Sequence, residues 1–237
     1  MIGMERKQKR LPLLGVYIVT IAGLLLAVMA GSRAVTVISE GLPLENRHCI
    51  IIDPGHGGED GGAISCTGRP ESEYNLEISL RLRDLMHLLG YETKMIRTTD
   101  VSVYTNGSSI AQKKVSDLKE RVRIINETGN SLLLSIHQNQ FTDNRYSGAQ
   151  VFYCATEGSQ ELAKQLQEAF VTSINPGSHR KSKKSDGVYL MEHVRCTGVL
   201  IECGFLSNPE EEARLGTPEY QIKLCCVIAA TVAEYLN

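Results

Sequence analysis

Three apolar runs in the sequence each lead to a side chain that could bind a metal ion or transfer a proton. His56 follows the run at 49–53 by three residues, and His137 directly follows the run at 131–136. Glu202 lies inside a third run, VLIECGF. In an open α/β sheet the carboxyl ends of the strands share one edge, where ligands gather. We therefore expect His56, His137 and Glu202 to lie close together.

A further carboxylate is needed to complete a catalytic metal site. Glu71 stands where the first expected helix begins, a short loop after His56. Two imidazoles, one carboxylate and an open position form the ligand set of a catalytic zinc site. A second carboxylate beside the bound water would act as general base. The residues alone leave the choice of ligand open among four nearby carboxylates: Glu59, Asp60, Glu71 and Glu73.

A structural role is the alternative for each of these residues. A single histidine at a strand end is more often a hydrogen-bonded structural residue than a ligand, but two beside carboxylates favour a metal. Glu202 is harder to explain as structural, because an unpaired buried glutamate costs several kcal/mol. The remaining histidines fit surface or structural positions better: His48, His87, His179 and His193.

Two other kinds of site are disfavoured. The segment GHGGEDGG lacks the spacing of a dinucleotide-binding loop and the Lys-Ser/Thr of a P-loop, and Glu59 and Asp60 would repel a phosphate. Cys203 could act as a nucleophile with His137. Its apolar neighbours indicate a raised thiol pKa and low reactivity.

The elements that must position these residues alternate between strands and helices. This alternation predicts a single α/β domain, with a twisted, mostly parallel sheet covered by helices on both faces. Apolar residues repeat at helical spacing over 71–89, 115–126, 159–174 and 220–236. The expected strands are 49–53, 91–99, 131–136, 148–155, 188–191 and 199–205, and 100–112 is expected to be a surface loop.

Composition excludes some classes of protein. A net charge of −2 over 237 residues gives no sign of nucleic-acid binding. Seven cysteines without CxxC spacing argue against a disulfide scaffold. Aromatic residues make up 5% and tryptophan is absent, so no stacking surface is evident. The basic loop 178–187 fits a solvated surface, or a surface that attracts an acidic polymer if it lies near the site.

The first 47 residues differ from the rest. Residues 11–30 carry no charge and are long enough to cross a bilayer, and basic residues precede them. We expect a signal or anchor segment at 1–30, a linker at 31–47 and one catalytic domain at 48–237. Val28-Met29-Ala30 also fits a signal-peptide cleavage site. Both interpretations predict export across the cytoplasmic membrane, with the rest of the chain either anchored to the membrane or secreted.

Four motifs resemble a known family, the zinc-dependent N-acetylmuramoyl-L-alanine amidases of bacterial cell-wall turnover. The motifs are IIDPGHGGEDGGA, E-x-x-x-N-L at 71–76, SIHQN at 135–139 and VLIECGFLSN at 199–208. They occur in order over about Cys49–Asn237. Leu118 and Arg121 match the L-x-x-R helix of the family. Within the family, the chain is most similar to the germination-specific amidases of the spore cortex.

The resemblance implies roles for individual residues. His56, Glu71 and His137 would bind Zn²⁺, with Glu73 as the competitor of Glu71, and Glu202 would be the catalytic carboxylate. The implied reaction is hydrolysis of the amide between N-acetylmuramic acid and L-alanine in peptidoglycan, as a step toward muramic-δ-lactam in the spore cortex. The alternatives are a zinc peptidase that cleaves within the stem peptide and a wall-binding module without catalysis.

The resemblance gives peptidoglycan of the spore cortex as the expected substrate. The sequence leaves open whether an accessory protein is a further partner. The N-terminal segment would contact the membrane, and nucleic acid is not expected to bind.

Overall fold

The computed structural model describes residues 48–237, the range expected for the catalytic domain. The expected signal or anchor segment (1–30) and linker (31–47) lie outside the described residues. Within the described part of the chain, no helix combines the length and the apolar character needed to cross a membrane.

The described residues form the predicted α/β fold around a six-stranded sheet with the order β2-β1-β3-β6-β4-β5. Strands β2, β1, β3 and β6 are parallel, and β4 runs antiparallel to β6. The central strands are buried on both faces, as continuous apolar runs predict. The strands are β1 (Cys49–Pro54), β2 (Thr93–Met95), β3 (Ser131–Asn139), β4 (Gln150–Tyr153), β5 (Lys183–Lys184) and β6 (Thr197–Phe205).

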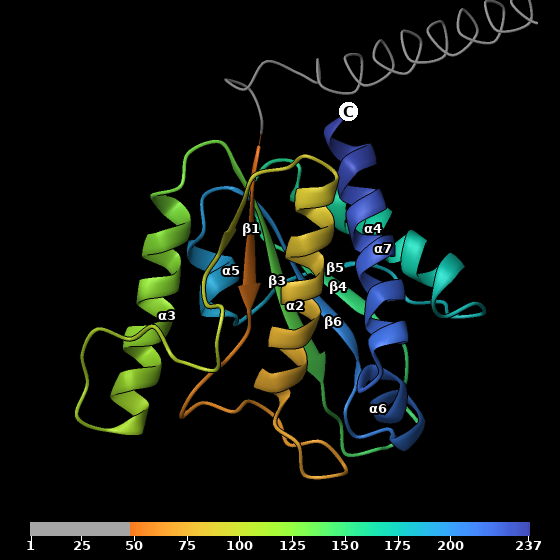
Figure 1. Ribbon diagram of the computed structural model, residues 1–237, viewed down its shortest axis with the longest axis horizontal. Helices are drawn as coiled ribbons and strands as arrows, with labels where there is room; N and C mark the ends of the chain where they lie inside the picture. Colours follow the sequence, from red (N-terminus) through yellow and green to blue (C-terminus); the bar gives the residue numbers. More distant parts are fainter. Residues whose placement is uncertain (1–47) are drawn as a thin grey trace, which may run out of the picture. The chain divides into compact units, whose positions relative to one another are not determined.

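Helices cover both faces of this sheet (Figure 1). One apolar core lies under α2 (Glu71–Leu88), α4 (Ser159–Ser173) and α7 (Pro218–Leu236). A smaller core lies on the other face, under α3 (Ile110–Asn126) and α5 (Tyr189–His193). Burial of these apolar faces at roughly 25 cal/mol per Å² supplies most of the driving force for folding. The predicted fold class is confirmed.

Several elements differ in extent from the sequence expectation. The strand expected at 91–99 is only Thr93–Met95, because the chain leaves the sheet to bury the guanidinium of Arg97 under the loop after β1. The loop expected at 100–112 ends earlier, since Ser109 caps α3 by accepting a hydrogen bond from the Gln112 amide (3.3 Å). The expected basic loop contains β5, a two-residue strand at the edge of the sheet.

The strand expected at 188–191 is wrong, because these residues enter the short helix α5. Leu190 and Met191 are adjacent, yet both pack in the same core with Val194. Neighbouring residues of a strand point to opposite faces, so only a helix can bury both on one side. A four-residue apolar run carries too little periodicity to show this difference.

One further helix, α6 (Pro209–Leu215), was not expected from the sequence. Asn208 caps it by accepting hydrogen bonds from the amides of Glu210 and Glu211, and Pro209 occupies its first turn. The carboxylate of Glu211 then accepts hydrogen bonds from the amides of Gly148 and Phe205, both at 2.9 Å. The helix thereby joins the segment that follows β3 to the end of β6.

Two buried arginines hold the turn that follows β1. Arg121 on α3 pairs with Asp53 at 2.5 Å and donates to the carbonyl oxygens of Pro54 and His56. Arg97 donates to the carbonyl oxygens of Pro54 and Gly55, both at 3.0 Å. Asp53 also accepts a hydrogen bond from Ser135 on β3. The backbone of this turn is therefore fixed by groups from three separate elements.

We predict that Arg121→Leu lowers the free energy of unfolding by about 3–5 kcal/mol, because it leaves the Asp53 carboxylate buried without a counter-ion. The matched control is Arg123→Leu on the same helix. Arg123 is exposed and pairs with Glu120 and Glu127 at the surface. Its loss should cost about 0–1 kcal/mol. Urea unfolding of both variants measures the difference, and equal midpoints would contradict the role given to Arg121.

Candidate metal centre

The structure brings His56, Glu71 and His137 together at the carboxyl edge of the sheet. Their ligand atoms all lie within 4.8 Å of one another. His56 Nε2 is 3.3 Å from one oxygen of Glu71, and His137 Nδ1 is 3.0 Å from the other. The two imidazole rings are 5.0 Å apart and nearly perpendicular. Three residues from the ends of β1 and β3 and the start of α2 thus form one cluster.

Glycines provide the space that the two imidazoles occupy. A Cβ on Gly55 would stand 2.2 Å from the His137 ring, and a Cβ on Gly62 would stand 2.6 Å from Glu71 and 2.7 Å from His56. His56 itself adopts a left-handed backbone conformation with φ 61°. Such a conformation is unfavourable for a residue with a Cβ and persists only where its surroundings enforce it. The arginine contacts described above supply that enforcement.

The Glu71 carboxylate is held in a fixed orientation behind the histidines. It accepts hydrogen bonds from the amides of Ala63 (3.0 Å) and Gln138 (3.1 Å) and from the Asn75 side chain (3.2 Å). Burial opposes ionisation of Glu71, but the hydrogen bond from His137 and the nearby imidazoles lower its pKa to about 2. The lowered pKa favours the ionised carboxylate, the form in which a glutamate binds a metal ion.

The other candidate carboxylates have different partners. Glu73 pairs with Arg69 at 2.8 Å, and Glu59 pairs with Lys113 at 2.8 Å. Asp60 lies 3.0 Å from His56 Nδ1, and this hydrogen bond holds the pKa of Asp60 well below its ordinary value. A carboxylate on the second ring nitrogen is the usual device that orients a metal-binding histidine. The geometry thus favours Glu71 as the ligand and Asp60 as the residue that orients His56.

Glu202 lies beside the cluster. It is the direct neighbour of His137 in the pairing of β3 with β6, so both side chains project from the same face. One carboxylate oxygen is fully buried and has no hydrogen-bond partner among the described residues. Burial raises the pKa of Glu202 to about 7, and the charge of Glu71 adds to this effect while His137 opposes it. A buried carboxylate without a partner is costly unless a ligand or substrate satisfies it.

The donor set fits a zinc ion. Zinc prefers imidazole nitrogen and carboxylate oxygen at about 2.0–2.2 Å, which puts tetrahedral neighbours about 3.4 Å apart. The separations of 3.0 and 3.3 Å between the Glu71 oxygens and the histidine nitrogens are close to this spacing. Three protein ligands would leave one position of such an ion for solvent or substrate. The unpartnered oxygen of Glu202 agrees with such an arrangement.

The disfavoured kinds of site find no support in the geometry. Cys203 belongs to the apolar core on the face of the sheet opposite to Glu202, and burial raises the pKa of its thiol far above the ordinary range. In the glycine turn, the Gly57 amide donates to Asp60 and the Gly58 amide to Asp100, which leaves neither for a phosphate. The weaker histidines lie outside the cluster: His48, His87, His179 and His193.

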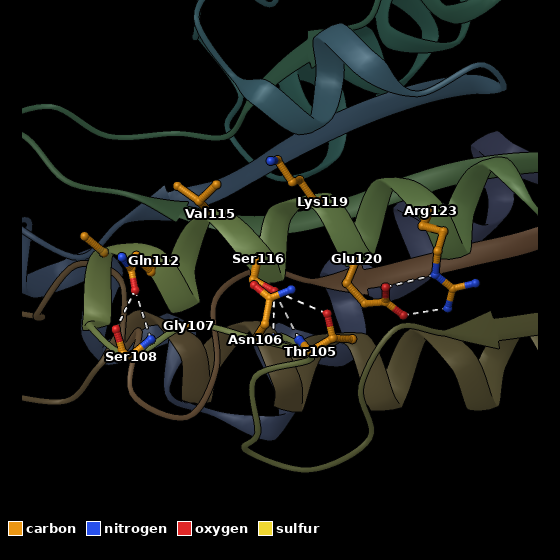
Figure 2. A pocket seen from close by; sticks show the side chains of 11 residues that line it. Thr105, Asn106, Gly107, Ser108, Gln112, Val115, Ser116, Lys119, Glu120 and Arg123 are labelled. Carbon is orange, nitrogen blue, oxygen red and sulfur yellow. Dashed lines mark hydrogen bonds and ion pairs between the residues drawn. The ribbon is translucent and has the colours of Figure 1, made fainter.

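A separate hollow of about 710 Å³ lies between α3 and the loop that precedes it. Figure 2 shows that several of its polar side chains form hydrogen bonds with other residues of the lining. Gln112 accepts from Ser108, and Ser116 accepts from the amides of Thr105 and Asn106. Its lining holds none of the clustered residues. These contacts hold the loop before α3 in place. In the same loop, Ser102 and Asp100 form hydrogen bonds with the turn that follows β1.

One residue that supports the site, Arg97, was not singled out from the sequence. Arg97 is buried, and besides its contacts to the turn it donates to the carbonyl of Ser72 at 2.8 Å. An arginine inside the apolar pattern of YETKMIRTT was the available signal. Its significance depends on long-range contacts, which local periodicity does not report.

A comparison with known protein families matches residues 50–234 to the N-acetylmuramoyl-L-alanine amidase model Amidase_3. The chain belongs to this family. The resemblance found in the sequence motifs is thus confirmed. Family members catalyse an amide hydrolysis, which agrees with a site that combines a metal-ligand cluster and a buried carboxylate.

Individual relatives are similar over most of their length. The germination-specific N-acetylmuramoyl-L-alanine amidase of Bacillus subtilis (strain 168) is 38% identical over 199 residues, which cover 83% of this chain and 82% of that protein. The structure of the CwlD amidase from Clostridioides difficile in complex with the GerS lipoprotein aligns with a TM-score of 0.77 and 36% identity, covering 80% of this chain and 98% of that one. The crystal structure of an N-acetylmuramoyl-L-alanine amidase from Clostridium difficile 630 aligns with a TM-score of 0.71 and 30% identity. The alignment covers 81% of this chain and 97% of that chain.

We predict that Gly55→Ala weakens metal binding by about 10-fold or more, since the added methyl group displaces the His137 imidazole. Gly129→Ala is the control, because a Cβ at Gly129 meets nothing within 4 Å. Metal content after dialysis against a graded chelator series measures the effect. If Gly55→Ala keeps its metal as firmly as Gly129→Ala, the close approach at Gly55 does not position His137.

Proposed function

We propose that this family member is a zinc-dependent amidase. It hydrolyses the amide between the lactyl group of N-acetylmuramic acid and the L-alanine that begins the stem peptide. The observation that carries this proposal is the cluster of His56, Glu71 and His137 with Glu202 as its immediate neighbour. These four side chains supply a metal-ligand set and one separate acid–base group.

The three clustered residues would hold the ion. Zinc at this position supplies a Lewis acid that polarises the scissile carbonyl and acidifies a water molecule. Other residues of the chain orient the side chains that would hold the ion. Asp60 fixes the His56 ring, and the hydrogen bonds from Ala63, Asn75 and Gln138 fix Glu71. Little reorganisation is then needed when substrate binds.

Glu202 is the proposed acid–base residue. As a carboxylate it accepts a proton from the attacking water, whose oxygen forms a bond to the carbonyl carbon. It then gives this proton to the nitrogen of L-alanine as the C–N bond breaks. The products are a muramic acid carboxylate and a stem peptide with a free amine. A pKa of about 7 suits a group that must both accept and donate a proton near neutral pH.

We predict that Glu202→Gln lowers kcat by about 10²–10⁴-fold, which is the range for loss of an acid–base group. Metal content and wall binding should stay unchanged, because Glu202 is not one of the clustered ligands. Glu210→Gln, at an exposed position on α6, is the control. Turnover of muropeptides and metal analysis are measured on the same preparations. Full activity in Glu202→Gln would rule out the role proposed here.

The products distinguish the proposal from its two alternatives. Digestion of purified peptidoglycan should release whole stem peptides that begin with a free L-alanine amine, as read by mass spectrometry. Peptide fragments cut within the stem would instead indicate a zinc peptidase. Binding without any release would indicate a wall-binding module. Removal of the metal by a chelator should abolish release, and added zinc should restore it.

The biological substrate proposed is the peptidoglycan of the spore cortex. The similarity to a Bacillus subtilis amidase named as germination-specific supports this choice. In that setting the product would be converted by another enzyme to muramic-δ-lactam. Spores that lack the gene should then contain cortex without this lactam. Normal lactam content in such spores would contradict the proposed role.

An accessory protein and export complete the proposal. A similar amidase from Clostridioides difficile forms a complex with a lipoprotein, which supports a partner of that kind. The uncharged run at 11–30 and the basic residues before it support export across the cytoplasmic membrane. Sequencing the N-terminus of the mature protein from membrane and wall fractions would separate an anchor from a cleaved signal.

A further inference from the structure

The end of β6 is lined by an arginine without a counter-ion among the described residues. The guanidinium of Arg180 lies over the ring of Phe205, 5.0 Å from its centroid. Its Nε donates to the carbonyl oxygen of Ser147 at 3.1 Å, and its Nη1 lies 3.4 Å from Oε1 of Gln150. No carboxylate in residues 48–237 lies within ion-pair distance of it. By contrast, Arg69, Arg121 and Arg123 each pair with carboxylates.

The contacts of Arg180 fix its position but leave binding capacity. A guanidinium has five N–H donors, and the two contacts above use two of them. The remaining donors meet no acceptor among the described residues. The Phe205 ring below and the Ser147 carbonyl beside it restrict the rotation of the side chain. A pre-oriented guanidinium with free donors is suited to hold a carboxylate through two parallel hydrogen bonds.

The strand pairing places one residue, Gln150, between this guanidinium and the proposed acid–base residue. Gln150, which Arg180 contacts, is the direct cross-strand neighbour of Glu202. Side chains at such positions have Cβ atoms about 5 Å apart on one face of the sheet. Phe205 pairs with Asn139, two residues beyond His137. Arg180 therefore borders the site on the side of β4, while the clustered ligands lie on the side of β1 and β3.

A row of aromatic rings continues from Arg180 toward solvent. The centroid of the Phe205 ring is 6.2 Å from that of Tyr146, and the Tyr146 centroid is 4.8 Å from that of Phe141. Phe141 and Tyr146 are about half exposed, at 51% and 47%. The row gives the guanidinium an apolar border, and less competition from water strengthens its interaction with an anion.

We propose that Arg180 binds a carboxylate of the stem peptide and so sets which peptidoglycan the enzyme accepts. This inference rests on the proposed function and extends it to the peptide side of the scissile bond. The residue after L-alanine in a stem peptide is a glutamate joined through its side-chain carboxyl, which leaves its α-carboxylate free. This anion lies one residue beyond the scissile amide, and Arg180 lies beyond Gln150, the cross-strand neighbour of Glu202. Where the same carboxyl is amidated, Arg180 has no anion to bind.

The test compares two N-acetylmuramoyl tripeptides that differ only at this carboxyl, L-Ala-γ-D-Glu-L-Lys and its D-isoglutamine counterpart. The wild-type enzyme should favour the carboxylate substrate by about 10- to 100-fold in kcat/KM, mainly through KM, as expected for a charge-assisted hydrogen-bond pair. Arg180→Gln should lose this preference and leave cleavage of the amidated substrate within about 2-fold. Arg180→Lys should restore part of the preference, because it keeps the charge without the planar fork.

Lys183→Gln is the matched control, because it removes the same charge from an exposed position on the neighbouring strand β5. It should leave the preference intact, whereas an equal loss would point to general attraction by the basic loop and overturn the proposal. Equal losses on both substrates in Arg180→Gln would overturn it too, as would no loss on either.

Failure of the proposed function gives a different result. If the wild-type enzyme cleaves neither tripeptide, calorimetric binding of both to the Glu202→Gln and Glu202→Gln/Arg180→Gln proteins still decides the role of Arg180. The carboxylate tripeptide should bind about 10- to 100-fold more weakly to the second protein. Equal affinity would overturn the inference independently of catalysis.

Discussion

The turn that follows β1, which carries His56, depends on the contacts of the buried Arg121 guanidinium. This guanidinium joins α3 to Asp53 at the end of β1 and donates to two carbonyl groups of the same turn, those of Pro54 and His56. A buried ion pair adds little net stability compared with apolar packing, but each partner becomes indispensable once the other is present. The main contribution of the pair is position. It holds His56 in a left-handed backbone conformation that the residue would not otherwise adopt.

Hydrogen bonds from neighbouring groups likewise fix the side chains of the candidate centre. Glu71 is oriented by two amides and the Asn75 side chain before any ligand arrives. Gln138 reaches Asn75 in turn, at 3.3 Å. One oxygen of Glu202, by contrast, is buried with no partner among the described residues. This oxygen agrees with the acid–base role proposed for Glu202, because burial without a partner is tolerated mainly where function needs it.

Electrostatics divide the edge of the sheet into two parts. On the side of β1 and β3, Glu71 is anionic and faces two imidazoles, which suits a cation. On the side of β4, Arg180 offers a positive charge over an aromatic ring. Glu202 lies between them on β6, paired with His137 on one flank and Gln150 on the other. A substrate with a polarisable carbonyl and a nearby carboxylate fits this division of charge.

The fold class, and the proximity of His56, His137 and Glu202, could be predicted from the residues alone. Continuous apolar runs identified β1, β3 and β6, and the residues at their ends follow from the rule that parallel strands share one functional edge. The motif E-x-x-x-N-L also contains Asn75, the neighbour that orients Glu71. Short segments were less predictable. The run at 188–191 is too brief for its periodicity to separate a strand from α5.

The identity of the carboxylate that faces the histidines, and of the groups that surround it, emerged from the folded chain. Glu59, Asp60, Glu71 and Glu73 are similar as residue types, and their roles differ because Lys113, His56 and Arg69 approach them from other parts of the chain. The aromatic row beside Arg180 could not be predicted from the sequence either, because aromatic residues are sparse and form no local pattern. Its rings and the guanidinium come from separate segments. Long-range contacts of this kind depend on the path of the whole chain, and no local pattern of residues encodes them.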